Sequence, residues 1–104
     1  MKPIRYLIPV VASITLCITA LASASEELAQ KNNCLACHMV DKKLIGPGFK
    51  EISEKYKGDS SAAETLAGKV KNGGGGVWGQ IPMPPNAAVP DDEIKAIVDW
   101  IMTL

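Results

Sequence analysis

The chain has 104 residues, and its 11 Lys and Arg side chains balance 11 Asp and Glu side chains to a formal net charge of +0. This length allows one small domain at most. The charge balance excludes the concentrated basic surface that nucleic-acid binding requires, so no nucleic-acid partner is expected.

The first segment has the layout of a secretory signal peptide. Lys2 and Arg5 form a basic start, residues 6–21 are almost entirely apolar, and residues 22–24 supply the small side chains of an A-x-A cleavage site. Pro9 interrupts the apolar run, which is shorter than the ~20 residues that a membrane-spanning helix needs. A retained membrane anchor is the alternative, but the cleavage pattern favours removal.

We therefore expect residues 1–24 to be removed and residues 25–104 to form one domain in the periplasm, without stable membrane association. Cleavage leaves 104 − 24 = 80 residues with a formal charge of 9 − 11 = −2. The exported part keeps Cys34 and Cys37, because Cys17 leaves with the signal. A domain of this size buries little surface and usually needs a disulfide network, a metal or a cofactor. Two cysteines this close cannot constrain much of the chain, so another group must fill its centre.

The exported part shows helical periodicity and no alternation typical of strands. Glu26 and Glu27 would occupy the first turn of a helix that runs to Asn33, where negative charge is favourable. A second helix stops at Gly58. One face of this second helix carries three apolar side chains, Phe49, Ile52 and Tyr56.

Two further helices follow. The third begins at Ser61, which lies three residues before Glu64 in a capping-box pattern, and ends at Asn72 and glycine. Its apolar face comprises Ala62, Leu66 and Val70. The last helix starts at Pro90 with three acidic residues. Its apolar stripe comprises Ile94, Ile97, Val98 and Ile101, widened by Trp100 and Leu104. These patterns predict an all-α domain.

Between the last two helices lies the stretch GGGGVWGQIPMPPNAAVP, whose glycine run and four prolines exclude regular structure. A loop this long in so small a domain is either functional or disordered. Four apolar side chains that favour burial argue against disorder: Val77, Trp78, Ile81 and Met83. We expect a functional loop, with some looseness from the consecutive glycines at 73–76.

The stretch CLACH places the only histidine of the chain, His38, directly after Cys34 and Cys37. A thioredoxin-like dithiol needs a preceding strand, and a zinc site needs four ligands. The pattern C-x-x-C-H is the attachment signature of a c-type haem: each cysteine can add to a vinyl group as a thioether, while the imidazole binds the iron. Export and the missing core favour one covalently attached haem c over a structural or redox pair of cysteines.

The iron ligand opposite His38 decides between an electron carrier and an enzyme. Met39 lies too close to His38 to reach the far face, and Met102 lies outside the apolar stripe of the last helix. Met83 is enclosed by three prolines, which restrict the backbone and lower the entropic cost of holding its thioether in place. The alternative is that Met83 fills a gap in the core. With His38 and Met83 bound, both axial positions are filled, and outer-sphere electron transfer remains.

The exported part resembles the short bacterial class I cytochromes c, which are small periplasmic monohaem electron carriers. The resemblance covers residues 25–104 and rests on the stretches CLACH, IGPGFKEISEKYKG, GVWGQIPMPPN and DDEIKAIVDWIMTL. It implies the cytochrome c fold, a few short helices around one covalently bound haem.

The resemblance also implies roles for single residues. Pro47 would accept a hydrogen bond from the His38 ring, and Trp78 would donate one to a haem propionate. Asn86 would hydrogen-bond the sulfur of the ligand methionine. Lys69 stands where the family often has an arginine near a propionate, and Trp100 would pack across the first helix.

The implied function is one-electron transport in a respiratory chain by a monomer that is not an enzyme. A quinol-oxidising complex would be the donor, and nitrite reductase or a cytochrome oxidase would be the acceptor. Three lysines near the attachment site would steer acidic partners, or form only a solvated face: Lys31, Lys42 and Lys43. One rival is a haem enzyme or gas sensor, which requires Met83 to be off the iron at rest. Another is a fixed subunit of a larger reductase.

Overall fold

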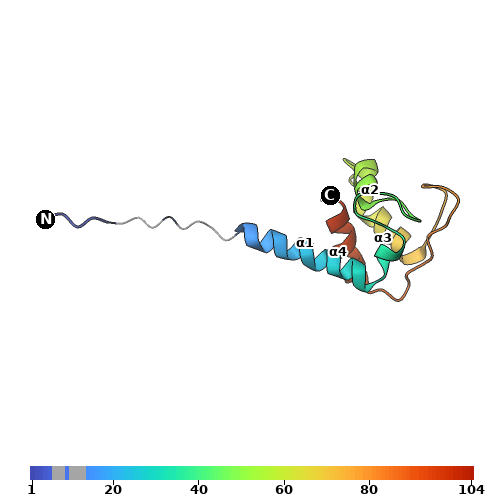
Figure 1. Cartoon of the computed structure of the whole chain (residues 1–104), viewed down its shortest axis with the longest axis horizontal. Coiled ribbons are helices and arrows are strands. Elements are labelled where there is room, and N and C mark those ends of the chain that lie inside the picture. The colour runs from blue at the N-terminus through green and yellow to red at the C-terminus, as the bar shows by residue number, and fades with distance from the viewer. Residues whose placement is uncertain (6–8, 10–13) are drawn as a thin grey trace.

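Four α-helices and one short 3-10 helix make up the fold in the computed structural model, which describes residues 1–5, 9 and 14–104, with side chains at 1–5, 9 and 23–104 (Figure 1). In chain order they are α1 (Ile14–Lys31), η1 (Cys34–Ala36), α2 (Phe49–Tyr56), α3 (Ala62–Asn72) and α4 (Asp91–Ile101). Only isolated bridges, and no strands, occur in the described ranges. The predicted all-α class is confirmed.

The first helix starts earlier than the sequence predicts. Glu26 and Glu27 were expected in its first turn, but α1 begins at Ile14 and continues through the predicted cleavage site to Lys31. The helix can do so because its 18 residues contain no glycine or proline and are rich in Ala, Leu and Glu. The N-terminal part of α1 extends away from the other helices in Figure 1. Cleavage after residue 24 would place the two glutamates at a helix start.

Part of the predicted signal peptide lies outside the described residues: residues 6–8 and 10–13, and the side chains of residues 14–22. Among the described helices, none has both the length and the hydropathy to cross a membrane. Removal of residues 1–24 therefore stays a prediction.

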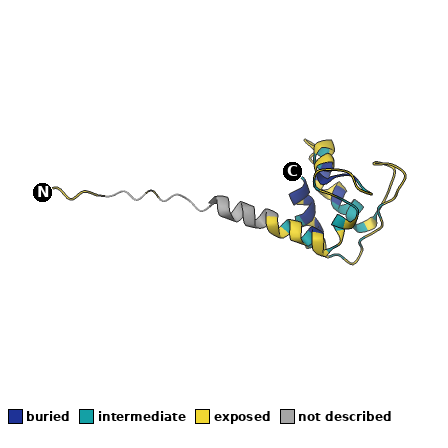
Figure 2. Cartoon of the chain, viewed as in Figure 1, coloured by how far each residue is buried: buried dark blue, intermediate teal, exposed yellow. Residues whose placement is uncertain are grey.

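Helix α4 organises the core, because it packs against α1, α2 and α3. Its predicted apolar stripe is confirmed: Ile94, Ile97, Val98 and Ile101 are all buried (Figure 2). Trp100 is buried as well and joins a cluster that includes Ala29 of α1, as expected for an aromatic side chain packed on the first helix. Leu104 was expected to widen this stripe but is exposed, because α4 ends at Ile101 and the chain turns away.

The start of α3 differs from the predicted capping box. Ser61 is the N-cap, but its side chain makes no bond to the helix. Its Oγ instead donates to Asp59 Oδ1 at 2.7 Å, and its backbone N–H donates to the same oxygen at 2.9 Å. Asp59 offers the hydroxyl a charged acceptor, and such charge-assisted hydrogen bonds are stronger than the neutral bond that the hydroxyl would accept from a helix N–H group. These two hydrogen bonds hold the pKa of Asp59 below its usual value, and the one from the Ser61 side chain has the larger effect.

Candidate functional site

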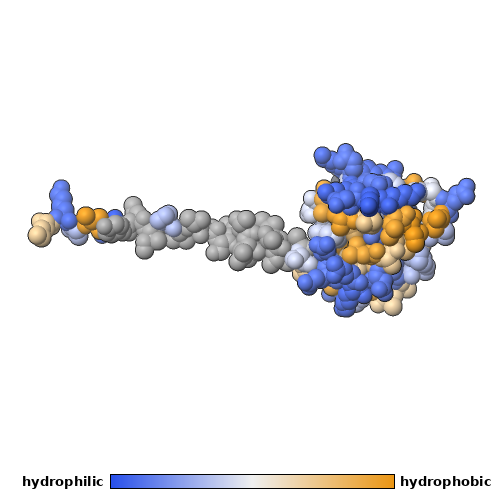
Figure 3. All heavy atoms as spheres, in the orientation of Figure 1, coloured by the Kyte–Doolittle hydropathy of each residue, from blue (hydrophilic) through white to orange (hydrophobic). Residues whose placement is uncertain are grey.

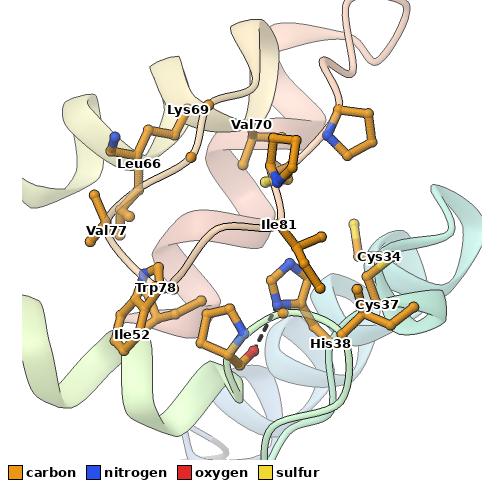
Figure 4. Close-up of a pocket in the computed structure, with 18 of the residues that line it drawn as sticks. Cys34, Cys37, His38, Ile52, Leu66, Lys69, Val70, Val77, Trp78 and Ile81 are labelled. Carbon is orange, nitrogen blue, oxygen red and sulfur yellow. Dashed lines mark hydrogen bonds between the residues drawn. The ribbon is translucent and has the colours of Figure 1, made fainter.

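A cavity of about 610 Å³ opens beside the core, within the size range of cofactor sites. Its wall is formed by η1, α2, α3, α4 and the loop between the last two helices. Figure 4 shows two opposite groups of side chains: Cys34, Cys37 and His38 on one side, and Leu66, Lys69, Val77 and Trp78 on the other. All seven predicted site residues line this cavity: Cys34, Cys37, His38, Pro47, Trp78, Met83 and Asn86.

The attachment stretch folds as a 3-10 turn rather than as part of an α-helix. Asn33 adopts a left-handed conformation (φ 61°) between the end of α1 and the start of η1, so the chain changes direction there. The N–H groups of Cys37 and His38 both donate to Cys34 O, at 3.2 and 3.0 Å. This turn brings two free thiols and one imidazole to the same cavity wall. Burial raises the pKa of the Cys34 thiol, so the neutral form is favoured there.

The His38 ring is oriented by a backbone carbonyl. Its Nδ1 lies 2.7 Å from the oxygen of buried Pro47 (dashed line in Figure 4). A carbonyl oxygen can only accept, so Nδ1 carries the proton and donates it. In the neutral ring, Nε2 then keeps its lone pair, which is the tautomer that a metal-binding histidine needs.

Two further neighbours of His38 were not predicted as site residues. The ring of Phe49 stacks on the imidazole, with centroids 5.2 Å apart and planes at 23°. At Gly46, a Cβ atom would lie only 2.7 Å from His38 Cε1, so no other residue fits there without displacement. The stretch IGPGF contains both residues, but its sequence shows only a turn followed by an apolar helix face.

The segment that carries Met83 is paired with the glycine run. Gly74 N–H donates to Met83 O at 3.0 Å, and Met83 N–H donates to Gly74 O at 2.7 Å. Gly73 has φ 73°, and a Cβ atom there would lie 2.6 Å from Met83 O. The start of the glycine run, expected to be loose, is therefore a close backbone contact that larger residues would block.

Asn86 ties the same segment to α3. Its backbone N–H and its Nδ2 both donate to Val70 O, at 3.0 and 3.1 Å. Nδ2 also lies 3.2 Å from Pro84 O. The Asn86 amide thus contacts the backbone of α3 and that of its own loop. The expected hydrogen bond from Asn86 to the Met83 sulfur stays a prediction.

The polypeptide itself leaves several apolar side chains at the cavity uncovered. Ile81 is 70% exposed and Trp78 is 38% exposed, although the apolar character of these side chains predicted burial. Five of the exposed large apolar residues line the cavity: Leu44, Ile45, Val77, Trp78 and Ile81. Apolar side chains also gather on the face of the molecule seen in Figure 3. A large, flat apolar group seated in the cavity would cover these side chains.

The donor set and the shape of the cavity fit a covalently attached haem c. Two free thiols and an imidazole with an available Nε2 share one cavity wall, and a thioether side chain, that of Met83, borders the same cavity. Lys69 adds a cation to the lining, and Lys55 lies with its Nζ 5.6 Å from the ring centroid of Trp78. These cations suit the acidic substituents of a porphyrin.

Comparisons with known proteins agree with this chemistry. The family model described as Cytochrome c matches residues 22–104. Cytochrome c-552 of Nitrosomonas europaea is 53% identical over 93 residues, which are 89% of this chain and 90% of that protein. Cytochrome c-551 of Pseudomonas aeruginosa is 41% identical over 103 residues, 99% of this chain and 98% of that protein.

Solved structures show the same fold. The crystal structure of wild-type Nitrosomonas europaea cytochrome c552 matches with a TM-score of 0.74 and 57% identity, and the match covers 76% of this chain and 98% of that one. The predicted resemblance is therefore confirmed. The chain belongs to the cytochrome c family: it carries a covalently attached haem c and transfers electrons rather than catalysing a reaction of its own.

Proposed function

We propose that this protein is a periplasmic one-electron carrier of a respiratory chain, in which Cys34 and Cys37 hold the haem and His38 and Met83 bind its iron. The observation that carries the proposal is the convergence of these four side chains on one cavity, with Nδ1 of His38 engaged by Pro47 O at 2.7 Å. When bound, haem c supplies an iron that alternates between the ferric and ferrous states.

The chain's own residues have distinct tasks in this proposal. Pro47 orients the imidazole and increases its basicity, as outer-shell carbonyls do at metal sites. The backbone pairing of Gly74 with Met83 presents the thioether, which favours ferrous iron. The apolar wall around Trp78 and Ile81 excludes water from the centre. His38 and Met83 would both bind the iron and leave it no position for a substrate, and Cys34 and Cys37 would hold the haem where it could exchange electrons with a partner.

Mass and N-terminal sequencing test haem attachment and cleavage, and the absorption spectrum tests the ligand set. The mass of the exported protein should equal that of residues 25–104 plus one haem, and N-terminal sequencing should begin at Ser25. The oxidised protein should show the weak near-infrared band of sulfur-to-iron charge transfer, and Met83→Ala should lose it. Rapid, tight binding of carbon monoxide to the reduced wild type would instead support the rival haem enzyme or gas sensor.

The proposed partners are a quinol-oxidising complex as donor and nitrite reductase or a cytochrome oxidase as acceptor, met by a diffusing monomer. Of the three lysines expected to steer them, Lys31 is paired with Glu93 at 3.1 Å. Lys42 and Lys43 are exposed, and Lys43 lies at the cavity. They are therefore the better candidates for attracting acidic partners.

The steering role predicts a rate that depends on ionic strength. Lys42→Glu with Lys43→Glu should slow electron transfer to an acidic acceptor at low salt, and the difference from the wild type should shrink as salt screens the charges. Lys95→Glu on α4 is a control for charge reversal at another exposed lysine, and it should be compared with each single variant, Lys42→Glu and Lys43→Glu, because each of the three changes the formal charge by −2. Equal rates for the wild type and the double variant at low salt would exclude steering by these lysines.

A further inference from the structure

The last turn of α3 carries a lysine whose side chain reaches the segment downstream of Met83. Lys71 Nζ donates to Val89 O at 3.0 Å and pairs with Asp91 Oδ1 at 2.9 Å. The side chain of Lys71 is only 34% exposed, whereas that of Asp91 is 88% exposed. The ammonium group is therefore held against the backbone of the loop, and the carboxylate lies on its solvent side.

This contact completes a row of three attachments that join the segment 83–91 to α3 and to the glycine run directly after it. The near end is fixed by the backbone pair of Gly74 and Met83, and the middle by Asn86 on Val70 O. Lys71 fixes the far end, just before α4 begins. It does so through a side chain, so it can be removed by substitution without altering the other two attachments.

We propose that Lys71 is a positioning residue that keeps Met83 on the iron by fixing the far end of its segment; this rests on the proposed ligation by Met83. A segment released at one end gains conformations when its thioether leaves the metal, which favours the detached state. The attachment at Lys71 removes that gain. Its action on the iron is indirect, through residues 84–89.

Of the two contacts, the hydrogen bond to Val89 O carries most of this effect. An ion pair with an exposed carboxylate contributes little and is screened by salt. A hydrogen bond from an ammonium group to a partly buried carbonyl is stronger. Removal of the Lys71 ammonium group would leave the Val89 oxygen without this donor, which costs free energy. Loss of Lys71 should therefore matter more than loss of Asp91, and the effect should persist at high salt.

The test is a titration of the oxidised holoprotein with imidazole, which displaces Met83. Loss of the sulfur-to-iron band measures this displacement. Lys71→Met keeps the apolar stem of the side chain and removes the ammonium group. We expect it to bind imidazole about tenfold more tightly than the wild type, at both low and high salt. Asp91→Asn should change the affinity less than about twofold, and Lys71→Arg, which retains donors, should restore most of the wild-type value.

Lys95→Met is the matched control, because Lys95 pairs with Asp99 on the surface of α4 and its loss changes the charge equally. Imidazole affinity within twofold of the wild type in Lys71→Met, or an equal increase in Lys95→Met, would overturn the proposal. The sulfur-to-iron band of each variant before imidazole is added shows that it is folded with Met83 bound. Absence of the band in the wild type would reject ligation by Met83 itself, a failure distinct from an unchanged affinity.

Discussion

At His38, the ring orientation is determined by three neighbours of different kinds. Pro47 contributes an acceptor, Phe49 contributes a flat face, and Gly46 contributes the absence of a side chain. Phe49 in turn contacts Trp100 edge-on, with centroids 5.6 Å apart and planes at 77°. The imidazole is thus packed against the core as well as held by its hydrogen bond, which restricts the orientation of the ring.

Gly46→Ala tests how closely the ring is packed. The new methyl group would meet His38 Cε1 at 2.7 Å, so the ring or the turn must move. We expect a loss of about 1–3 kcal/mol in the free energy of unfolding, as for other overpacked sites, together with a changed reduction potential. Denaturant unfolding and redox titration measure the two effects.

Gly68→Ala is the control for this substitution. A Cβ atom at this position within α3 meets no heavy atom within 4 Å. Alanine should stabilise the helix by up to about 1 kcal/mol and leave the potential unchanged. Similar destabilisation by both substitutions would contradict the close packing of Gly46 on the ring.

At the scale of the elements, each end of α3 is fixed by different chemistry. Its start is preceded by a turn in which Asp59 accepts two hydrogen bonds from Ser61, and its end is bound to the loop that carries Met83. The helix therefore connects the turn after α2 to the sulfur side of the cavity. Its apolar residues Leu66 and Val70 line the cavity between these ends.

The Asp59 turn predicts a pH-dependent contribution to stability. The pKa of Asp59 is lower in the folded than in the unfolded chain, mainly because of the hydrogen bond from Ser61 Oγ. The stabilisation is therefore complete above the unfolded pKa and is lost as pH falls through the lower folded pKa. Asp59→Ala should be slightly less stable than the wild type at pH 7, and the difference should shrink near pH 3. Denaturant unfolding at both pH values measures it; an equal difference would contradict the role of the charge.

At the scale of the whole molecule, α4 belongs both to the packed core and to the wall of the cavity. Ile97, Val98 and Ile101 are buried against other helices and also line the cavity. The opposite wall is the loop with exposed Trp78 and Ile81. A haem seated in this cavity would supply the layer that joins this loop to the helices, as expected for a domain too small to build a complete core from side chains.

Removal of the attachment residues tests this dependence. Cys34→Ala with Cys37→Ala should yield a protein without covalent haem that has lost most of its helical circular dichroism and its cooperative thermal transition. Leu104→Ala, at an exposed position beyond α4, should bind haem and unfold as the wild type does. A haem-free double variant with wild-type helicity and a cooperative transition would show that the polypeptide folds by itself.

Sequence reasoning succeeded where the physical signal is local. The apolar stripe of Ile94, Ile97, Val98 and Ile101 predicted the buried face of α4, and the pattern CLACH predicted which thiols and imidazole share a cavity wall. It failed at Ser61, because the hydroxyl can accept from a helix N–H group or donate to a neighbouring carboxylate, and the sequence does not show which role it takes. It also placed the start of the first helix too late.

The sequence alone determined the helical class, the haem attachment motif and the proline-bordered methionine, because periodicity, residue spacing and restricted backbone act over a few neighbouring residues. Only the tertiary structure decided that Gly46 and Phe49 pack on His38, that Gly73 and Gly74 lie against the Met83 backbone, and that Lys71 reaches Val89. The contacts on His38 depend on the turn before α2, whereas those of Gly73, Gly74 and Lys71 exist because the loop between α3 and α4 folds back onto the end of α3. Such approaches depend on how the elements pack, which no local pattern encodes.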